Sequence, residues 1–75
     1  MGMQCHFSLN DLPESVGVSR FYEKESQTIS WTLTNGHTVS GTDSPDVWFD
    51  IGSMSPSALD MIEFLIRNRV CFQCS

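Results

Sequence analysis

Apolar and polar residues alternate most clearly between Thr28 and Thr42, on both sides of the pair Asn35-Gly36. A period of two is typical of strands with one buried face, and Asn-Gly is a strong signal for a tight turn. The segment therefore predicts a β-hairpin with one apolar face. The opposite face consists of hydroxyl side chains: Ser30, Thr32, Thr34, Thr38 and Ser40.

The register of this hairpin depends on the length of its loop. With a two-residue turn at Asn35-Gly36, Trp31 would face Ser40, and the apolar residues would be divided between the two faces. With a three-residue loop that ends in a left-handed Gly36, Trp31 faces Val39 instead. Because this second register buries the apolar side chains together, we expect the bulged loop.

A helix is predicted from Pro56 to Arg69. Ser55 supplies an N-cap, proline is tolerated at the first helical position, and arginine side chains near the end complement the helix dipole. At about 100° per residue, the apolar side chains cover an arc of roughly 240°, which is wider than one sheet normally covers. These side chains are Ala58, Leu59, Met61, Ile62, Leu65 and Ile66, with Phe64 further round.

The remaining segments have shorter and less regular patterns. Cys5 to Leu9 and Ser19 to Lys24 each predict a short strand, because alternation or aromatic and β-branched residues favour strands. Thr42 to Asp46 predicts a turn or the start of a short helix with a serine cap. Val47 to Ile51 alternates like a strand but follows Ser-Pro, so we predict an irregular segment or a single turn. Val70 to Cys74 is predicted to be strand-like or loose.

Together these elements predict an α+β fold in which residues 1–75 form a single small domain. Its small antiparallel sheet has three to four strands, with one main C-terminal helix packed on one face. At 75 residues the core of such a domain is near the size at which stability becomes marginal. The predicted core consists of Trp31, Leu33, Val39, Leu59, Ile62, Leu65 and Ile66, and its end is expected to be closed by Trp48 and Phe49.

Charge and cysteine content narrow the classes of function. Nine acidic against four basic side chains give a formal net charge of -5. Direct nucleic-acid binding is not expected, because it requires clustered Lys and Arg. No apolar run reaches the roughly 18 residues needed to span a membrane. The three cysteines cannot all pair within one chain, which favours a reducing compartment, and we expect a cytoplasmic location.

The cysteines and histidines offer a possible metal site. Cys71 and Cys74 have the two-residue gap of a zinc knuckle, and Cys5, His6 or His37 could supply further ligands. Knuckles usually contain Gly or Pro, and this segment has neither, so buried or reduced thiols are the simpler interpretation. We expect no cofactor, with zinc as an alternative. A redox role is not expected, because both cysteines follow a helix C-terminus, which raises a thiol pKa.

No arrangement of residues predicts an enzyme. Asp43, Asp46 and Asp50 lie between hairpin and helix and could bind Mg²⁺ or Ca²⁺, but they lack the alternating ligands and central glycine of a calcium loop. Turn formation and capping account for them. The histidines have no nucleophile partner that spacing identifies, and no phosphate-binding glycine loop exists.

The uncharged hydroxyl face and the wide apolar arc of the helix both favour contact with another protein, because natural sheets usually place Lys or Glu on exposed strands. We therefore predict a non-catalytic protein-interaction module. By analogy of class, it resembles small acidic inhibitors or accessory proteins of phages and mobile elements that bind a larger protein. A homodimeric structural protein and a small zinc-binding module are the alternatives. The predicted partner-binding residues are Ser30, Thr32, Thr38, Ser40, Met61 and Phe64.

Overall fold

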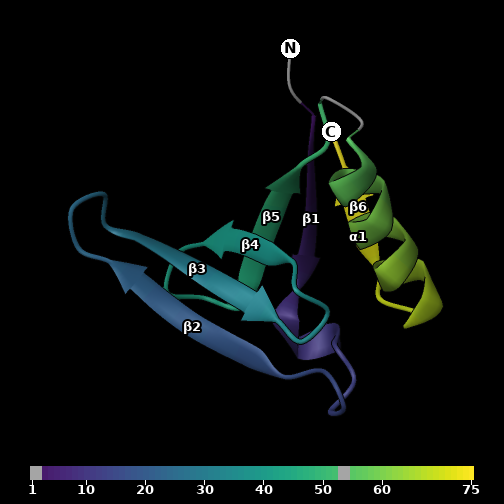
Figure 1. The fold of residues 1–75 in the computed structure, drawn as a ribbon, viewed down its shortest axis with the longest axis horizontal. Helices are drawn as coiled ribbons and strands as arrows, with labels where there is room; N and C mark the ends of the chain where they lie inside the picture. The colour runs from purple at the N-terminus through teal and green to yellow at the C-terminus, as the bar shows by residue number, and fades with distance from the viewer. Residues whose placement is uncertain (1–2, 53–54) are drawn as a thin grey trace.

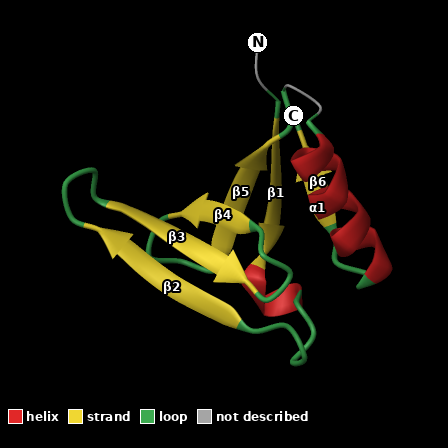
Figure 2. Cartoon of the chain, viewed as in Figure 1, coloured by secondary structure: helices red, strands yellow, loops and turns green. Residues whose placement is uncertain are grey.

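The computed structural model of the chain describes residues 3–52 and 55–75. These residues form a single sheet, a short 3-10 helix and an α-helix that lies at one end of the sheet (Figures 1 and 2). The elements are β1 (Gln4–Ser8), η1 (Leu9–Asp11), β2 (Val18–Glu23), β3 (Thr28–Leu33), β4 (Thr38–Gly41), β5 (Asp46–Asp50), α1 (Pro56–Arg67) and β6 (Phe72–Cys74).

The sheet has six strands in the order β2-β3-β4-β5-β1-β6, and all neighbours are antiparallel. The prediction of three to four strands is therefore wrong, although the α+β class is compatible with the structure. The first strand of the chain lies between β5 and β6, which come from its second half (Figure 1). This placement leaves β2 and β6 as the two edge strands.

β5 is the strand that the sequence pattern did not identify. It pairs along its whole length with β1, from Gln4 opposite Asp50 to Ser8 opposite Asp46. Local periodicity over five residues is ambiguous, and here a partner from the start of the chain decides the conformation. The preceding Ser44 does not cap a helix. Its hydroxyl accepts a hydrogen bond from the Asp46 N–H at 3.1 Å and closes a turn.

The hairpin of β3 and β4 has the predicted register. Trp31 lies opposite Val39, and the Leu33 N–H donates to the His37 carbonyl at 2.8 Å. Gly36 donates to the Leu33 carbonyl at 2.9 Å and has a φ of 89°, which glycine adopts without steric cost. The three-residue bulged loop is confirmed.

The helix begins as predicted and ends slightly earlier. The Ser55 hydroxyl accepts a hydrogen bond from the Ala58 N–H at 3.2 Å, and Pro56 is the first helical residue. The helix ends at Arg67, because Arg69 adopts a left-handed conformation with a φ of 56°. One buried stripe of α1 faces the sheet. We call the face of the sheet toward α1 the inner face and the opposite face the outer face.

The core lies between α1 and the inner face, and its buried side chains are Cys5, Phe7, Ile29, Leu33, Val39, Val47, Ile51, Ala58, Met61, Leu65 and Val70. The prediction that Leu33, Val39 and Leu65 form the core is confirmed, while Trp31 and Ile62 are only half-buried.

Two predicted core residues on the helix lie outside the core. Leu59 is 48% exposed and Ile66 is 62% exposed. Ala58, Met61 and Leu65 fill the side of α1 that meets the sheet, so the other two side chains fall on its shoulder. The apolar arc of the helix is wider than its contact with the sheet.

Trp48 also differs from its prediction. It lies opposite Ser40 and His6, on the outer face of the sheet, and its ring centroid is 6.4 Å from that of His6. Phe49, the next residue, points to the inner face and packs against Phe7 with ring centroids 6.2 Å apart. Successive residues of a strand face opposite sides, so only one of the two could close the core.

The expectation that all three cysteines are reduced is wrong in this structure. Cys5 and Cys74, which lie opposite each other on β1 and β6, form a disulfide across a sequence separation of 69. Cys71 is free and exposed. The pairing follows from topology, because β1 and β6 come from opposite ends of the chain and still become neighbours.

Candidate interaction surface

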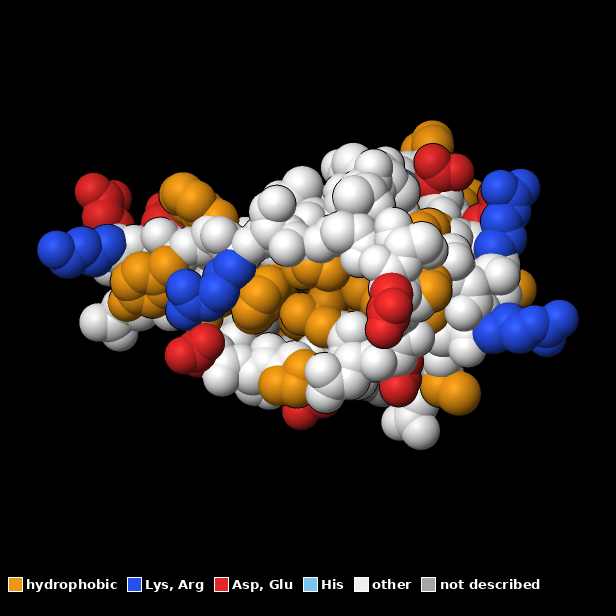
Figure 3. All heavy atoms as spheres, turned by 90° about the horizontal axis from the view of Figure 1, so that it is seen from below, with side chains coloured by type: hydrophobic (Ala, Val, Ile, Leu, Met, Phe, Trp, Pro, Cys, Tyr) orange, Lys and Arg blue, Asp and Glu red, His pale blue; other side chains and the backbone are white. Residues whose placement is uncertain are grey.

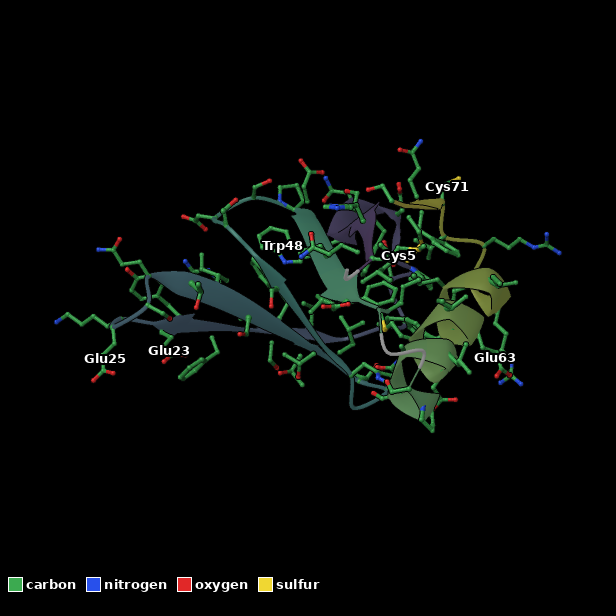
Figure 4. The ribbon with its side chains drawn as sticks, turned by 90° about the horizontal axis from the view of Figure 1, so that it is seen from above. Cys5, Glu23, Glu25, Trp48, Glu63 and Cys71 are labelled. Carbon is green, nitrogen blue, oxygen red and sulfur yellow. A yellow bond between two sulfur atoms is a disulfide. The ribbon has the colours of Figure 1, made fainter. Side chains whose placement is uncertain are left out.

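β2 and β3 form a two-stranded arm, defined here as residues 18–33. The strands pair over six positions, from Val18 opposite Leu33 to Glu23 opposite Thr28. The arm extends away from α1, with Glu23 and Glu25 near its far end and Glu63 on the helix at the opposite end of the molecule (Figures 1 and 4). All six residues of β2 are exposed.

The outer face of β3 and β4 carries the predicted hydroxyl surface. Thr32, Thr38 and Ser40 are exposed and Ser30 is half-buried, and the hydroxyls of Thr32 and Thr38 lie 3.5 Å apart. Phe21, which is not among the predicted contact residues, lies opposite Ser30 on this face and is 62% exposed. The hydroxyl surface thus has an aromatic side chain at its margin.

Adjacency in the sequence was the signal that could have identified this aromatic residue. Phe21 and Tyr22 are neighbours in a predicted strand, so one of them had to point away from the core face in any register. In the structure Tyr22 takes the inner face and Phe21 the outer face. Both remain exposed, because β2 lies at the edge of the sheet.

The inner face of the arm combines aromatic side chains with an ion pair. The Arg20 guanidinium lies 6.0 Å from the centre of the Trp31 ring and 3.3 Å from the Asp43 carboxylate. Tyr22 is 47% exposed, and Val18 is also exposed. Seen from below, hydrophobic side chains run from the arm toward the centre of the molecule, beside basic and acidic groups (Figure 3).

The free edge of β2 presents backbone groups as well. Because the Thr34 N–H donates to the Gly17 carbonyl at 3.0 Å, the alternating antiparallel pattern fixes which groups bond to β3. Odd-numbered residues of β2 direct their N–H and C=O groups toward β3. Outward-pointing N–H and C=O groups belong to Val18, Arg20 and Tyr22.

The two predicted contact residues on the helix have different surroundings. Met61 belongs to the buried core, which removes it from the accessible contact residues. Phe64 is half-buried and lines a pocket of about 190 Å³ between α1 and the hairpin loop. In the same place the His37 imidazole Nε2 lies 3.7 Å from the Asp60 carboxylate, so this pair links the loop to the helix.

A second pocket, of about 260 Å³, opens where β4 and β5 separate beyond their two paired positions. Hydroxyl groups of Thr38, Ser40 and Ser57 line it, together with Trp48 and Asp50. Such a lining suits ordered water or a polar group of a partner. The pocket also reaches Ala58 and Met61, so it connects Thr38 and Ser40 of the hydroxyl surface with the start of α1.

The candidate metal ligands are not brought together. The sulfur atoms of Cys5 and Cys74 are bonded to each other, and His37 lies beside the helix. Cys71 lines a different pocket, of about 470 Å³, which His6 also lines. Within residues 3–52 and 55–75, no group of three or more His, Cys, Asp or Glu side chains is arranged to hold a metal ion.

The three aspartates between the hairpin and the helix are also separated. Asp43 pairs with Arg20, while Asp46 and Asp50 occupy the two ends of β5. Asp50 accepts a hydrogen bond from the Gly52 N–H at 2.7 Å, and Asp46 lies in the turn closed by Ser44. Turn formation and ion pairing account for these carboxylates.

Comparison of the chain with protein-family models, curated proteins and solved structures gives no match. In the described part of the chain, no helix is long and apolar enough to cross a membrane.

Proposed function

We propose that this protein is a non-catalytic interaction module that binds a larger protein, as an inhibitor or an accessory factor. The observation that carries the proposal is the pair of exposed aromatic side chains on the arm, Phe21 and Tyr22. They lie on opposite faces of a strand whose six residues are all exposed. Exposed apolar groups rimmed by polar side chains are typical of protein-binding surfaces, and each face of β2 presents one aromatic ring beside polar neighbours.

The inner face of the arm supplies the side chains for this contact. Arginine, tyrosine and tryptophan contribute most often to binding energy at protein interfaces, and here Arg20, Tyr22 and Trp31 lie together. The guanidinium lies 3.3 Å from the Asp43 carboxylate and 6.0 Å from the centre of the indole ring, so both neighbours favour its position on this face. A side chain that is already positioned loses less conformational entropy on binding.

The charge of the molecule favours a partner with a basic margin around its apolar surface. All nine acidic side chains are exposed, and the net charge is -5. Glu23 and Glu25 lie near the end of the arm (Figure 4). Complementary charge around an apolar contact raises the rate of association and disfavours acidic partners.

The test is affinity capture from a lysate of the source cells, with Tyr22→Asp compared with Leu59→Asp. The two wild-type side chains are almost equally exposed, at 47% and 48%, but they lie on the arm and on the helix respectively. We expect wild type and Leu59→Asp to retain one protein in stoichiometric amount and Tyr22→Asp to lose it. Absence of a stoichiometric partner, or loss only with Leu59→Asp, contradicts the proposal.

A cytoplasmic location is part of the same proposal, on the basis of the odd number of cysteines. The Cys5–Cys74 disulfide makes this part measurable, since a reducing compartment would leave three thiols and the disulfide leaves one, at Cys71. Thiol alkylation in intact cells, followed by mass spectrometry, counts the free thiols. Three labelled cysteines agree with the cytoplasm, and one labelled cysteine contradicts it.

A further inference from the structure

We infer that the free edge of β2 pairs with β2 of a second copy of this chain, so that two sheets join into one continuous antiparallel sheet about a two-fold axis. This inference rests on the edge and the side chains of β2, and it does not depend on the larger partner proposed above. The backbone pairing uses only the edge of β2, and the side chains next to that edge gain contacts with the second copy.

β2 lacks several of the features that keep edge strands apart. Protected edges are short, carry charged side chains or proline, or contain a bulge. β2 pairs with β3 over six consecutive positions and contains no proline, and its two charged residues, Arg20 and Glu23, have opposite signs. A charge on the inner face of an edge can also prevent pairing, but the Arg20 charge is paired with Asp43.

The alternation of backbone groups restricts how two copies can align. Hydrogen bonds between the edges require outward-facing residues to lie opposite each other, so even-numbered residues must face even-numbered residues. If Arg20 faced itself, two guanidinium groups would be directly opposite. If Tyr22 faced itself, Arg20 would face Lys24, and like charges opposite each other are destabilising.

One register avoids both of these like-charge contacts and pairs β2 along most of its length. With Arg20 opposite Tyr22 of the second copy, no like charges face each other directly. Phe21 then lies on the two-fold axis, opposite Phe21 of the second copy, and Ser19 faces Glu23. A shift in the other direction, with Val18 opposite Arg20, leaves the end of β2 outside the paired region.

The side chains gain contacts in this register that they lack in a single chain. Phe21 is 62% exposed, and its new position is a non-hydrogen-bonded pair, where opposite side chains approach most closely, at about 4.5 Å between Cα atoms. Two aromatic rings facing each other across strands stabilise the pairing. On the inner face, each Arg20 guanidinium gains the Tyr22 ring of the other copy, a cation–π contact.

The first test uses two lysine substitutions on the same face of the same strand, measured by light scattering over a dilution series of purified protein. We expect wild type to pass from dimer to monomer on dilution. Phe21→Lys places two like charges on the axis and weakens the dimer by at least about tenfold. Ser19→Lys adds the same charge opposite Glu23 and tightens the dimer by about two- to fivefold at low salt.

The second test locates the interface through individual amide groups. The N–H of Tyr22 points outward and that of Phe21 points toward β3, so hydrogen exchange of Tyr22 should slow with rising protein concentration while that of Phe21 changes much less. Tyr22→Pro removes an outward N–H without removing a bond to β3, and we expect this variant to stay monomeric. Its retained fold is checked by the dispersion of its amide spectrum.

Three results would overturn the inference. The first is a monomer at every concentration. The second is a dimer that persists in Phe21→Lys and is lost in Ile66→Lys, which would place the contact on the exposed shoulder of α1. The third is equal weakening by Ser19→Lys and Phe21→Lys, which would contradict the register. A partner captured from lysate bears on none of these, so the two proposals can fail separately.

Discussion

The two ends of the sheet are built from similar alternating strands, yet they hold their side chains differently. Beneath α1, the strands β5 and β1 bury Val47, Cys5 and Phe7 almost completely. At the other end, no residue of β2 is buried. Within the arm only Ile29 and Leu33 of β3 are buried, so β2 is held mainly by backbone pairing to β3, while most of the other buried side chains come from β4, β5, β1 and α1.

This difference separates stability from recognition. The helix-covered half contains most of the buried apolar side chains and the disulfide, so most of the stabilising free energy should come from it. The arm contains exposed aromatic groups and an open edge, which are features of contact surfaces. Substitutions in the covered half should therefore change mainly the free energy of unfolding, and substitutions in the arm mainly the contacts with other molecules. The expected loss of stability falls from the covered half to the arm.

In the oxidised protein, the largest expected effect is loss of the disulfide. Cys74→Ser should lower the free energy of unfolding by about 4 kcal/mol, because the bond closes a loop across a sequence separation of 69 in the unfolded chain. Urea unfolding at equilibrium measures the change. Cys71→Ser is the matched control, since Cys71 is free and exposed, and it should leave stability almost unchanged. Similar losses in both variants would contradict the assignment.

A smaller effect is expected from truncating the core side of the helix. Leu65→Ala should destabilise the protein by about 3 kcal/mol, because Leu65 is fully buried between α1 and the sheet. Leu59→Ala, the same change on the exposed shoulder, should cost less than about 1 kcal/mol. Thermal and urea unfolding of the two variants compare them directly. An equal cost would mean that α1 packs in a different orientation.

The hairpin loop lies between the two halves, and its substitution should have an intermediate effect. Gly36→Ala should cost about 1 kcal/mol, because a φ of 89° is unfavourable for a side chain with a Cβ atom. Gly36→Asn should cost less, since asparagine tolerates left-handed conformations better. Unfolding measurements that rank the two variants the other way round would argue against the bulged loop.

The smallest effect is expected in the arm itself. Asp43→Asn removes the charge that pairs with Arg20, and exposed ion pairs contribute little to stability. We expect hydrogen exchange of β3 amides that bond to β2 to rise by less than about fivefold, with no change in β1. A loss of protection throughout the sheet would show that the arm and the covered half unfold as one unit.

Local patterns were sufficient for the hairpin and for the start of the helix. Burying Trp31 and Val39 together selects one register, and Ser55 caps the helix that Pro56 begins. The strands β1 and β2 were predicted within one residue of each end. In these cases the deciding interaction connects residues close in sequence, which is the range that a single sequence reveals.

The remaining features depend on contacts between distant segments. β5 becomes a strand because β1 pairs with it, and Cys5 meets Cys74 because β6 pairs with the other edge of β1. Leu59 and Ile66 on the shoulder of α1 are exposed because the sheet does not extend far enough to cover them. Helical periodicity gives the apolar arc of a helix but not the extent of the sheet beneath it. Phe21 could have been recognised as a contact residue from its neighbour Tyr22, without any knowledge of the fold.

The pairing of β1 with β6 also gives the fold a cyclic character. Gln4 and Ser75 exchange two backbone hydrogen bonds, of 3.0 and 2.9 Å, so the chain returns to its own beginning (Figure 1). A circular permutant opened in the turn between β2 and β3, with the present ends joined by a short linker, keeps all five strand pairs. The new chain ends would then lie at the far end of the arm, and β2, as the last strand of the permuted chain, could be replaced by another strand sequence.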